Sequence, residues 1–358
     1  MKNNMSLDLN NKDWKEFELG MLFKIYTGGD LIISRVQKGD IPIISHSIAN
    51  NGVAEWTEPI PKQKLFNFKR TISLADRGNF YAYTQKTDFY VGTRVKALEA
   101  IFSNSNVNIL NFICLSINKQ SVKFSYGNNA TGGVEQLKIM LPVNVNGEPD
   151  FEFMEAFISR KKDEKKDYYR KYILNRIKKL KNSEVVGRLE EREWLEFYLK
   201  DIFNEIQRGK RLRKADHKKG KKPYVSSTAL NNGIDGYVGN KDKVRFFSNC
   251  LTIANSGSVG ACFYQPFEFV ASDHVTQLKN DKFNPYIYKF LSSIVKRLGV
   301  KYSFNREMND TRIKSEKIML PVNENNEPDY DYMENYMKQL EYKKLTDYLK
   351  YTELRNVI

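Results

Sequence analysis

Apolar and polar residues follow two different patterns along this chain. Four short runs are rich in β-branched or aromatic residues and are bounded by Gly, Asn, Asp or Pro, at 41–45, 89–95, 251–254 and 267–271. Such runs predict β-strands. Two longer stretches of helix-forming residues follow Pro149 and Pro328, and each Pro is followed directly by Asp. Because Pro and an acidic residue favour the first turn of a helix, we predict long helices over about 150–182 and from 329 to the C-terminus.

Both predicted helices carry an apolar stripe at steps of three and four, interrupted in the first helix by the charged residues 161–166. The stripes consist of Met154, Phe157, Ile158, Tyr169, Tyr172, Ile173, Ile177 and Leu180, and of Met333, Tyr336, Met337, Leu340, Leu345, Tyr348 and Leu349. A narrow stripe on a helix about 45 Å long suits packing against a second helix better than against a sheet. We therefore predict an antiparallel coiled coil that holds two globular halves apart. The alternative is that each helix packs on its own half.

The sequence repeats itself at an offset of about 180 residues. Trp14-Lys-Glu-Phe-Glu-Leu19 returns as Trp194-Leu-Glu-Phe-Tyr-Leu199, and Lys138-Ile-Met-Leu-Pro-Val-Asn144 returns as Lys317-Ile-Met-Leu-Pro-Val-Asn323. Pro42-Ile-Ile-Ser45 with Asn50-Asn-Gly52 returns as Pro223-Tyr-Val-Ser226 with Asn231-Asn-Gly233. The chain is a tandem duplication.

The duplication and the element pattern together define a fold class. We predict an α+β fold with two tandem, repeat-related domains of mixed α/β structure and pseudo-two-fold symmetry. The predicted domains span 12–149 and 190–327, and the two long spacer helices span 150–189 and 328–358.

The composition is that of a folded, basic protein. The chain has 358 residues, of which 41% are hydrophobic and 13% aromatic, so it is not a disordered chain and is long enough for about two domains. Its formal net charge of +15 and pI of about 9.4 favour a polyanionic partner. The three cysteines have neither zinc-site spacing nor the number for a disulfide framework, so we expect a reducing, cytoplasmic location. No run of about 18 apolar residues exists, so no membrane partner is expected.

Catalytic and cofactor motifs are missing from the sequence. It has no phosphate-binding glycine loop, no dinucleotide fingerprint and no nucleophile elbow, and its three histidines stand apart. We therefore predict no cofactor and no metal site. Asn284-Pro-Tyr286 is interpreted as a helix start rather than a methyltransferase loop.

One loose pattern would make the chain a nuclease. Pro149-Asp150 followed by Asp163-Glu-Lys165, and Pro328-Asp329 followed by Glu341-Tyr-Lys343, fit a Pro-Asp and Asp/Glu-x-Lys arrangement that can hold Mg²⁺. That site needs acids that converge from strands, whereas these lie along charged helices. We interpret them as solvated helix faces.

Basic residues cluster between 208 and 222, where only Asp216 opposes them. We predict that this run is a mobile loop on DNA phosphates, with a solvated linker as the alternative. Its candidate contacts are Arg208, Lys210, Arg211, Arg213, Lys214, Lys218 and Lys219. The equivalent stretch of the first copy holds only Arg35 and Lys38, and the first copy places its basic candidates farther along, at Lys86, Arg94 and Lys96.

Polar turn residues next to predicted strands supply groups that can read base edges. Arg pairs with guanine, Asn with adenine, and Ser or Thr with several bases. Turn architecture alone also favours these residue types, so both interpretations stay open. The candidates are His46, Ser47, Arg77 and Asn79 in the first copy, and Ser227, Thr228, Asn255, Ser256, Ser258 and His274 in the second. Two further segments combine basic, aromatic and amide groups for DNA contact: Lys123, Tyr126 and Asn128, and Lys301, Asn305 and Arg306.

The ordered duplication resembles the DNA specificity subunit of Type I restriction-modification systems. The repeated Trp-x-Glu-Phe-x-Leu, Pro-x-Ile/Val-Ser and Leu-Pro elements carry the resemblance over residues 12 to 358. The chain is also similar to Type IIB specificity subunits. The resemblance implies that each half is a target-recognition domain for one part of a split double-stranded DNA sequence and that the helices form the coiled coil.

The same resemblance implies protein partners. Two methyltransferase subunits dock in that family, with restriction subunits as further partners, and the methyltransferases flip adenine out of the duplex. We expect the helix residues Tyr168, Tyr332 and Tyr351 to contribute to docking. The predicted function is a non-catalytic, DNA-binding specificity subunit. The alternatives are a DNA-modifying enzyme, which would need a cofactor or Mg²⁺, and a coiled-coil scaffold, which would leave the basic loop unexplained.

Overall fold

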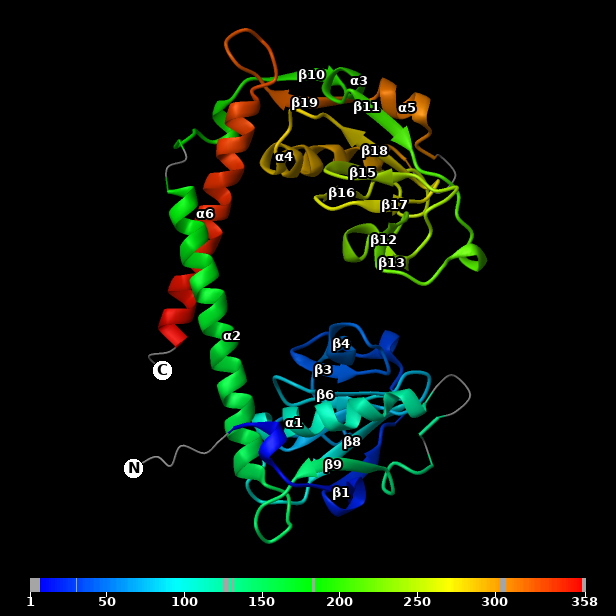
Figure 1. The fold of residues 1–358 in the computed structure, drawn as a ribbon, viewed down its shortest axis with the longest axis vertical. Coiled ribbons are helices and arrows are strands. Elements are labelled where there is room, and N and C mark those ends of the chain that lie inside the picture. The colour runs from blue at the N-terminus through cyan, green and yellow to red at the C-terminus, as the bar shows by residue number, and fades with distance from the viewer. Residues whose placement is uncertain are drawn as a thin grey trace. The chain divides into compact units, whose positions relative to one another are not determined.

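The computed structural model describes residues 7–29, 31–124, 129–130, 132–181, 184–302 and 307–355. The chain divides into two units, unit 1 (Met1–Tyr169) and unit 2 (Arg170–Ile358). The two units repeat nearly the same order of strands and helices (Figure 1). No helix in the described part of the chain is long and apolar enough to cross a membrane.

The described part of unit 1 contains three small sheets. The largest has four antiparallel strands in the order β2-β8-β5-β6, and a second has the order β4-β3-β7, in which β3 and β7 are parallel. The third pairs β1 with β9. The strands are β1 (Trp14–Glu18), β2 (Phe23–Thr27), β3 (Ile41–Ile44), β4 (Val53–Thr57), β5 (Thr71–Ala75), β6 (Tyr81–Thr84), β7 (Tyr90–Val91), β8 (Val95–Ala100) and β9 (Lys138–Pro142).

Two helices complete the core of unit 1. Helix α1 (Val107–Asn118) is capped by Asn106, whose side chain accepts hydrogen bonds from the backbone N–H groups of Asn108 and Ile109, as expected for a helix start. It covers the four-stranded sheet with residues three and four apart, and the first turns of α2 (Phe151–Leu180) close the same core with Phe153 and Met154. Helix α2 begins in unit 1 and its last turns belong to unit 2.

Unit 2 repeats this arrangement. Its four-stranded sheets have the orders β11-β18-β15-β16 and β13-β12-β17-β14, and β10 pairs with β19. The strands are β10 (Trp194–Tyr198), β11 (Glu205–Arg208), β12 (Lys222–Val225), β13 (Ile234–Val238), β14 (Phe246–Phe247), β15 (Cys250–Ala254), β16 (Cys262–Gln265), β17 (Phe269–Ala271), β18 (Val275–Lys279) and β19 (Lys317–Pro321). The helices are α3 (Leu199–Ile202), α4 (Pro285–Val295), α5 (Asp310–Ser315) and α6 (Tyr330–Arg355).

The repeated Trp motif is structural. The Trp14 and Trp194 rings stack on Phe112 and Phe290, at centroid distances of 6.2 and 6.4 Å, and each indole N–H donates to a backbone carbonyl five residues earlier. Leu19 and Leu199, which end the motif, are fully buried. The motif therefore anchors the β1-β9 and β10-β19 sheets to their cores.

The repeated Asn-Asn-Gly motif adopts a left-handed backbone conformation. Asn50, Asn51 and Gly52 all have positive φ, and Asn231, Asn232 and Gly233 repeat the same conformation. Asn and Gly tolerate the left-handed region better than other residues. The motif thus fixes the turn that leads from β3 to β4 and from β12 to β13.

The helix starts are confirmed, and one predicted strand is wrong. Asp150 and Asp329 each accept a hydrogen bond from the backbone N–H three residues later, at 2.9 Å, and Asn284 caps α4. The run 89–95 is not one strand: it divides into β7 and the start of β8, because the chain turns at 92–94, where Arg94 has a φ of 64°. A continuous apolar run does not reveal such a change of sheet.

The apolar stripes of the long helices serve two purposes. Met154 and Ile158 lie in the core of unit 1, and Met333, with Tyr336 and Met337 beside it, packs in the core of unit 2. The first turns of each helix therefore pack on their own unit, as the alternative interpretation expected. Within unit 2, the last turns of α2 lie beside α6 (Figure 1), and Arg176 Nε pairs with Glu341 at 2.6 Å. The rest of the coiled coil, like the predicted domain boundaries, stays a prediction.

Candidate nucleic-acid interface

Three turns of unit 1 lie together at one end of its sheets. Asn79 Nδ2 donates to the His46 carbonyl at 3.2 Å, the Asp76 N–H donates to the Arg94 carbonyl at 3.4 Å, and Asn129 accepts from the Gly78 N–H at 3.2 Å. We name His46, Ser47, Arg77, Asn79 and Arg94 the unit 1 turn cluster. Residues far apart in sequence thus form one polar surface.

Most side chains of the unit 1 turn cluster are available to a partner. Arg77, Asn79 and Arg94 are exposed, and His46 and Ser47 are half-buried. Arg94 also adopts a left-handed backbone conformation that a non-glycine residue takes at some cost, and such strain is common at functional sites. The cluster can donate two guanidinium forks and one amide to a ligand.

Unit 2 assembles the equivalent turns with different side chains. The Ser258 N–H donates to the Ser227 carbonyl at 3.0 Å, and Ser256 Oγ lies 2.6 Å from His274 Nδ1. A Cβ on Gly257, whose φ is +62°, would come within 2.7 Å of Ser227 Oγ, so the close approach of the two turns requires glycine there. We name Ser227, Thr228, Ser256, Ser258 and His274 the unit 2 turn cluster.

Several predicted DNA contacts are buried and need correction. Lys96 is 8% exposed; its ammonium donates to Thr27 Oγ1 at 2.9 Å and lies 3.8 Å from Asp76, so it stabilises the unit rather than presenting a charge to phosphates. Asn255 is fully buried, and Ser256, at 8% exposure, is held by His274. Sequence spacing placed Asn255 and Ser256 in the right turn but did not show that their side chains are buried. It also did not show that Lys96 lies in β8 with a buried side chain.

The buried position under each cluster differs between the units. Burial raises the pKa of Asp76, and the nearby Lys96 ammonium opposes that rise. In unit 2 the equivalent pair is Asn255 and Thr276, which carry no charge, and Thr276 Oγ1 lies 3.4 Å from Asp310. One unit therefore has an ion pair beneath its turns, whereas the other has two uncharged polar residues at the same positions.

The basic run starts beside the unit 2 turn cluster. Arg208 Nε donates to the Asp273 carbonyl, next to His274. Most of its other basic side chains are exposed: Lys210, Arg211, Arg213, Lys214, Lys218 and Lys219. Part of the run is tied to the unit: the Asn240 side chain accepts from the Lys218 N–H at 2.8 Å and donates to the Asp216 carbonyl at 2.9 Å. The mobility of the run stays a prediction. Arg213 pairs with Asp216 at 2.8 Å, which reduces its availability.

The remaining candidate residues fall into three groups. Arg35 and Lys86 are exposed on unit 1, and Lys123 is exposed at the end of a 3₁₀ helix. Lys301 is exposed and pairs with Glu316 at 2.9 Å. Tyr126, Asn128, Asn305 and Arg306 lie outside the described residues.

One of the three predicted docking tyrosines is wrong. Tyr168 is 75% and Tyr351 53% exposed, in keeping with a contact role. Tyr332 is 4% exposed, its hydroxyl donates to the Gly187 carbonyl at 3.1 Å, and the Arg192 guanidinium lies 4.6 Å from its ring centroid. Helical spacing alone did not show that a segment before β10 covers this face.

The acids of the loose nuclease pattern have structural partners. Asp150 Oδ2 binds Lys12 at 2.5 Å, Asp163 pairs with Lys166 at 3.7 Å, and Asp329 pairs with Arg192. Among the described residues, no group of three or more His, Cys, Asp or Glu side chains could hold a metal ion. All three cysteines are buried, and burial raises the pKa of Cys250 and of Cys262 to about 12, so neither thiol forms a thiolate near neutral pH.

Two residues of this surface were missed from the sequence. Asn129 binds the Gly78 turn, and Asp273 lies next to His274, with its carboxylate 3.9 Å from Nε2. The repeat alignment could have identified Asp273, because its neighbour His274 stands where unit 1 has Arg94. No comparable pattern marked Asn129.

Comparison with known proteins gives consistent matches along the chain. A family model described as "Type I restriction modification DNA specificity domain" matches residues 11–168 and 191–350. The specificity subunit S.BcgI of a Type II restriction enzyme from Heyndrickxia coagulans is 29% identical over 342 residues, covering 92% of this chain and 95% of that protein.

Solved structures match over most of the chain at low identity. The S subunit of a Type I restriction-modification system from M. genitalium has a TM-score of 0.49 and 17% identity, covering 99% of this chain and 95% of that one. The HsdS subunit from Thermoanaerobacter tengcongensis has a TM-score of 0.32 and 14% identity, covering 93% of this chain and 91% of that one.

Proposed function

The chain belongs to the Type I restriction modification DNA specificity domain family, and on that premise we propose that it selects the DNA target of a restriction-modification complex. Each unit contacts one half of a split double-stranded sequence. The turn clusters carry this proposal: the same scaffold occurs twice, and in each copy three turns bring polar side chains to one surface. A duplicated scaffold with different turns suits two half-sites of different sequence.

Affinity and specificity come from different residues in this proposal. The exposed lysines and arginines of 208–222 contact phosphates beside the unit 2 turn cluster, and the turn side chains other than the buried Ser256 contact base edges. Arg77 and Arg94 suit guanine, and Asn79 suits adenine. Lys86, Lys123 and Arg35 add phosphate contacts on unit 1.

The catalytic steps belong to other subunits in this proposal. Two methyltransferase subunits, with restriction subunits as further partners, assemble on the chain, and Tyr168 and Tyr351 contribute to their docking. A paired coiled coil of α2 and α6 sets the spacing of the half-sites, in keeping with the Arg176–Glu341 pair. This proposal assigns no cofactor to the chain.

Selection from a random duplex library tests the proposal. The full-length chain, alone and with its methyltransferase subunit, is incubated with the library at about 150 mM salt, and bound duplexes are sequenced. We expect a motif of two defined parts separated by a fixed spacer, and the same motif among modified sites lost from the genome when the gene is deleted. Uniform recovery of all sequences would overturn the proposal. Methylation or cleavage by the isolated chain would favour the enzyme alternative.

A further inference from the structure

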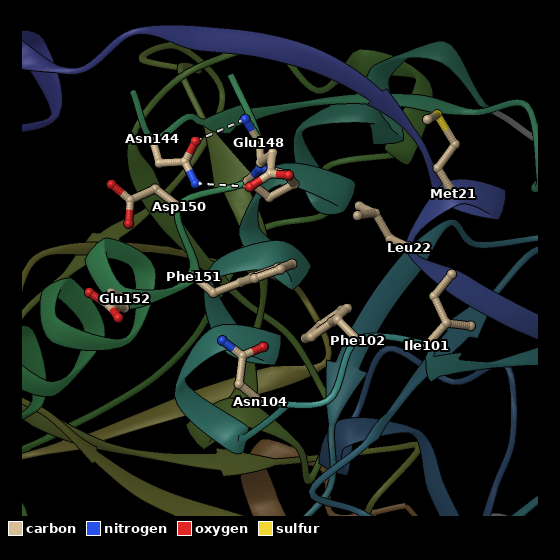
Figure 2. Close-up of a pocket in the computed structure, with 11 residues that line it drawn as sticks. Met21, Leu22, Ile101, Phe102, Asn104, Asn144, Glu148, Asp150, Phe151 and Glu152 are labelled. Carbon is tan, nitrogen blue, oxygen red and sulfur yellow. Dashed lines mark hydrogen bonds between the residues drawn. The ribbon is translucent and has the colours of Figure 1, made fainter. Parts of the chain in front are cut away.

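Unit 1 has a pocket of about 620 Å³ at the junction of the turn before β2, the end of β8 and the start of α2. Figure 2 shows Met21, Leu22, Ile101 and Phe102 on one side of it, and Asn144, Glu148 and Asp150 on the other. The proposed DNA contacts do not line it.

The first side of the pocket is apolar and open to solvent. Met21 is 64% and Ile101 60% exposed, although both are large apolar side chains. The rings of Phe102 and of Phe151, at the start of α2, also line the pocket and stack on each other at a centroid distance of 4.2 Å. Exposed apolar groups gathered around a concave surface are typical of a protein contact.

The opposite side of the pocket is acidic. The described lining residues include the carboxylates of Glu148, Asp150 and Glu152 and no lysine or arginine. The Asp150 carboxylate pairs with Lys12 and accepts the hydrogen bond that caps α2, whereas Glu148 and Glu152 are exposed. On a chain of net charge +15, such a rim repels phosphates and attracts cationic side chains.

Unit 2 lacks the apolar half of this pocket. Unit 2 has Asp201, directly before Ile202-Phe203, at the position that Met21 occupies directly before Leu22-Phe23. It has Asp281, directly after Asn280, at the position that Ile101 occupies directly after Ala100. Both aspartates are exposed, and Asp281 pairs with Lys279 at 2.8 Å. The same fold therefore accepts Asp at both positions, and the open apolar side chains of unit 1 are not needed for folding.

We propose that this pocket binds a segment of the methyltransferase subunit that presents an apolar side chain flanked by Lys or Arg. The inference rests on the proposed function, which supplies the protein partner. Because the apolar side exists in unit 1 alone among the described residues, the contact is made once per chain. One of the two methyltransferase subunits is then held more tightly than the other.

The test exchanges residues between the units of the full-length chain. The M21D/I101D variant gives unit 1 the residues of unit 2, and L9D, which alters an exposed apolar residue elsewhere in unit 1, is the matched control. Binding of the purified methyltransferase subunit is titrated by biolayer interferometry. Loss of two buried apolar contacts should weaken the tighter binding event about 10- to 100-fold and leave the weaker one unchanged.

A second measurement does not depend on a variant. Hydrogen exchange of the wild-type complex should show protection at 19–23, 100–104 and 148–153 and none at the equivalent 199–203 and 280–282. If wild type and M21D/I101D bind the methyltransferase subunit equally, or if the unit 1 segments show no protection, the pocket is not the binding site. Either result leaves the proposed function intact. If the wild type binds no methyltransferase subunit, the partner claim of the proposed function fails with it. Self-association of the wild type that M21D/I101D abolishes would assign the pocket to a second copy instead and overturn the proposal.

Discussion

The two turn clusters occupy equivalent places on a repeated scaffold and carry different chemistry. The unit 1 turn cluster has two arginines, an amide, an imidazole and one hydroxyl group, whereas the unit 2 turn cluster has four hydroxyl groups and an imidazole. The anchoring contacts differ little: Trp14 and Trp194 stack alike, and Asp150 and Asp329 cap their helices alike. These anchoring contacts are therefore shared by the two units, whereas the side chains of the turn clusters differ.

The units differ beneath the clusters as well. Asp76 and Lys96 form a buried ion pair in unit 1, where unit 2 has Asn255 and Thr276. A buried ion pair contributes little on balance, but removal of one partner leaves a buried charge and is costly. The two units therefore hold similar turns by arrangements that cannot be exchanged one residue at a time.

The largest expected effect follows from breaking this pair. Asp76→Asn gives unit 1 the residue of unit 2 but leaves the Lys96 ammonium buried without its carboxylate, so we expect the free energy of unfolding to fall by about 3 kcal/mol. The double variant D76N/K96T recreates the neutral pair and should recover most of that loss. Urea unfolding of the full-length chain measures both. A double variant no more stable than the single one would contradict the argument.

The next effect sharpens the comparison of the clusters. Arg77→Ala should weaken DNA binding about 10-fold and relax the choice of base at one position in the half-site of unit 1, because a bidentate contact to guanine contributes about 1–3 kcal/mol. Ser256 occupies the equivalent place in unit 2 and is buried, so Ser256→Ala should leave the base preference unchanged. Library selection with each variant gives the result. If Arg77→Ala weakens all sequences equally, Arg77 contacts phosphate instead.

These contrasts show what the sequence could predict. The duplication, the helix starts and the turn residues that meet in each cluster followed from repeats and local propensities, which short segments carry. The burial of Lys96 and Tyr332 could not be predicted in this way, because it depends on residues distant in sequence. Lys96 contacts Thr27 and Asp76, and Tyr332 contacts Gly187 and Arg192. The prediction of one strand over 89–95 was wrong for the same reason, because β7 pairs with β3 in one sheet and β8 pairs with β5 in another.

A smaller effect concerns the unequal basic segments. Residues 208–222 carry many exposed cations, and the equivalent stretch of unit 1 carries few. We expect R211Q/K214Q to reduce the slope of log K against log salt by about 2, because each phosphate contact contributes about 0.9. Arg213→Gln alone should do less, since Arg213 is paired with Asp216. Lys317→Gln, which removes a lysine paired with Glu196, is the control. An unchanged slope for R211Q/K214Q would remove this segment from the DNA contact.

The smallest effect distinguishes the two long helices. Glu341 on α6 pairs with Arg176, whereas the equivalent residue on α2 is Lys162, whose pKa is lowered by burial and by Lys166. Arg176 also lowers the pKa of Glu341, chiefly through their hydrogen bonds, so the pair stabilises the fold above the ordinary carboxyl pKa of about 4.5 and is lost as the pH falls through the lowered value. Glu341→Gln should therefore cost about 1 kcal/mol at pH 7 and progressively less as the pH falls below the ordinary carboxyl pKa of about 4.5. Urea unfolding of both proteins over a series of pH values measures the difference. A cost that stays constant down the acidic series would mean that packing, rather than charge, joins these helices.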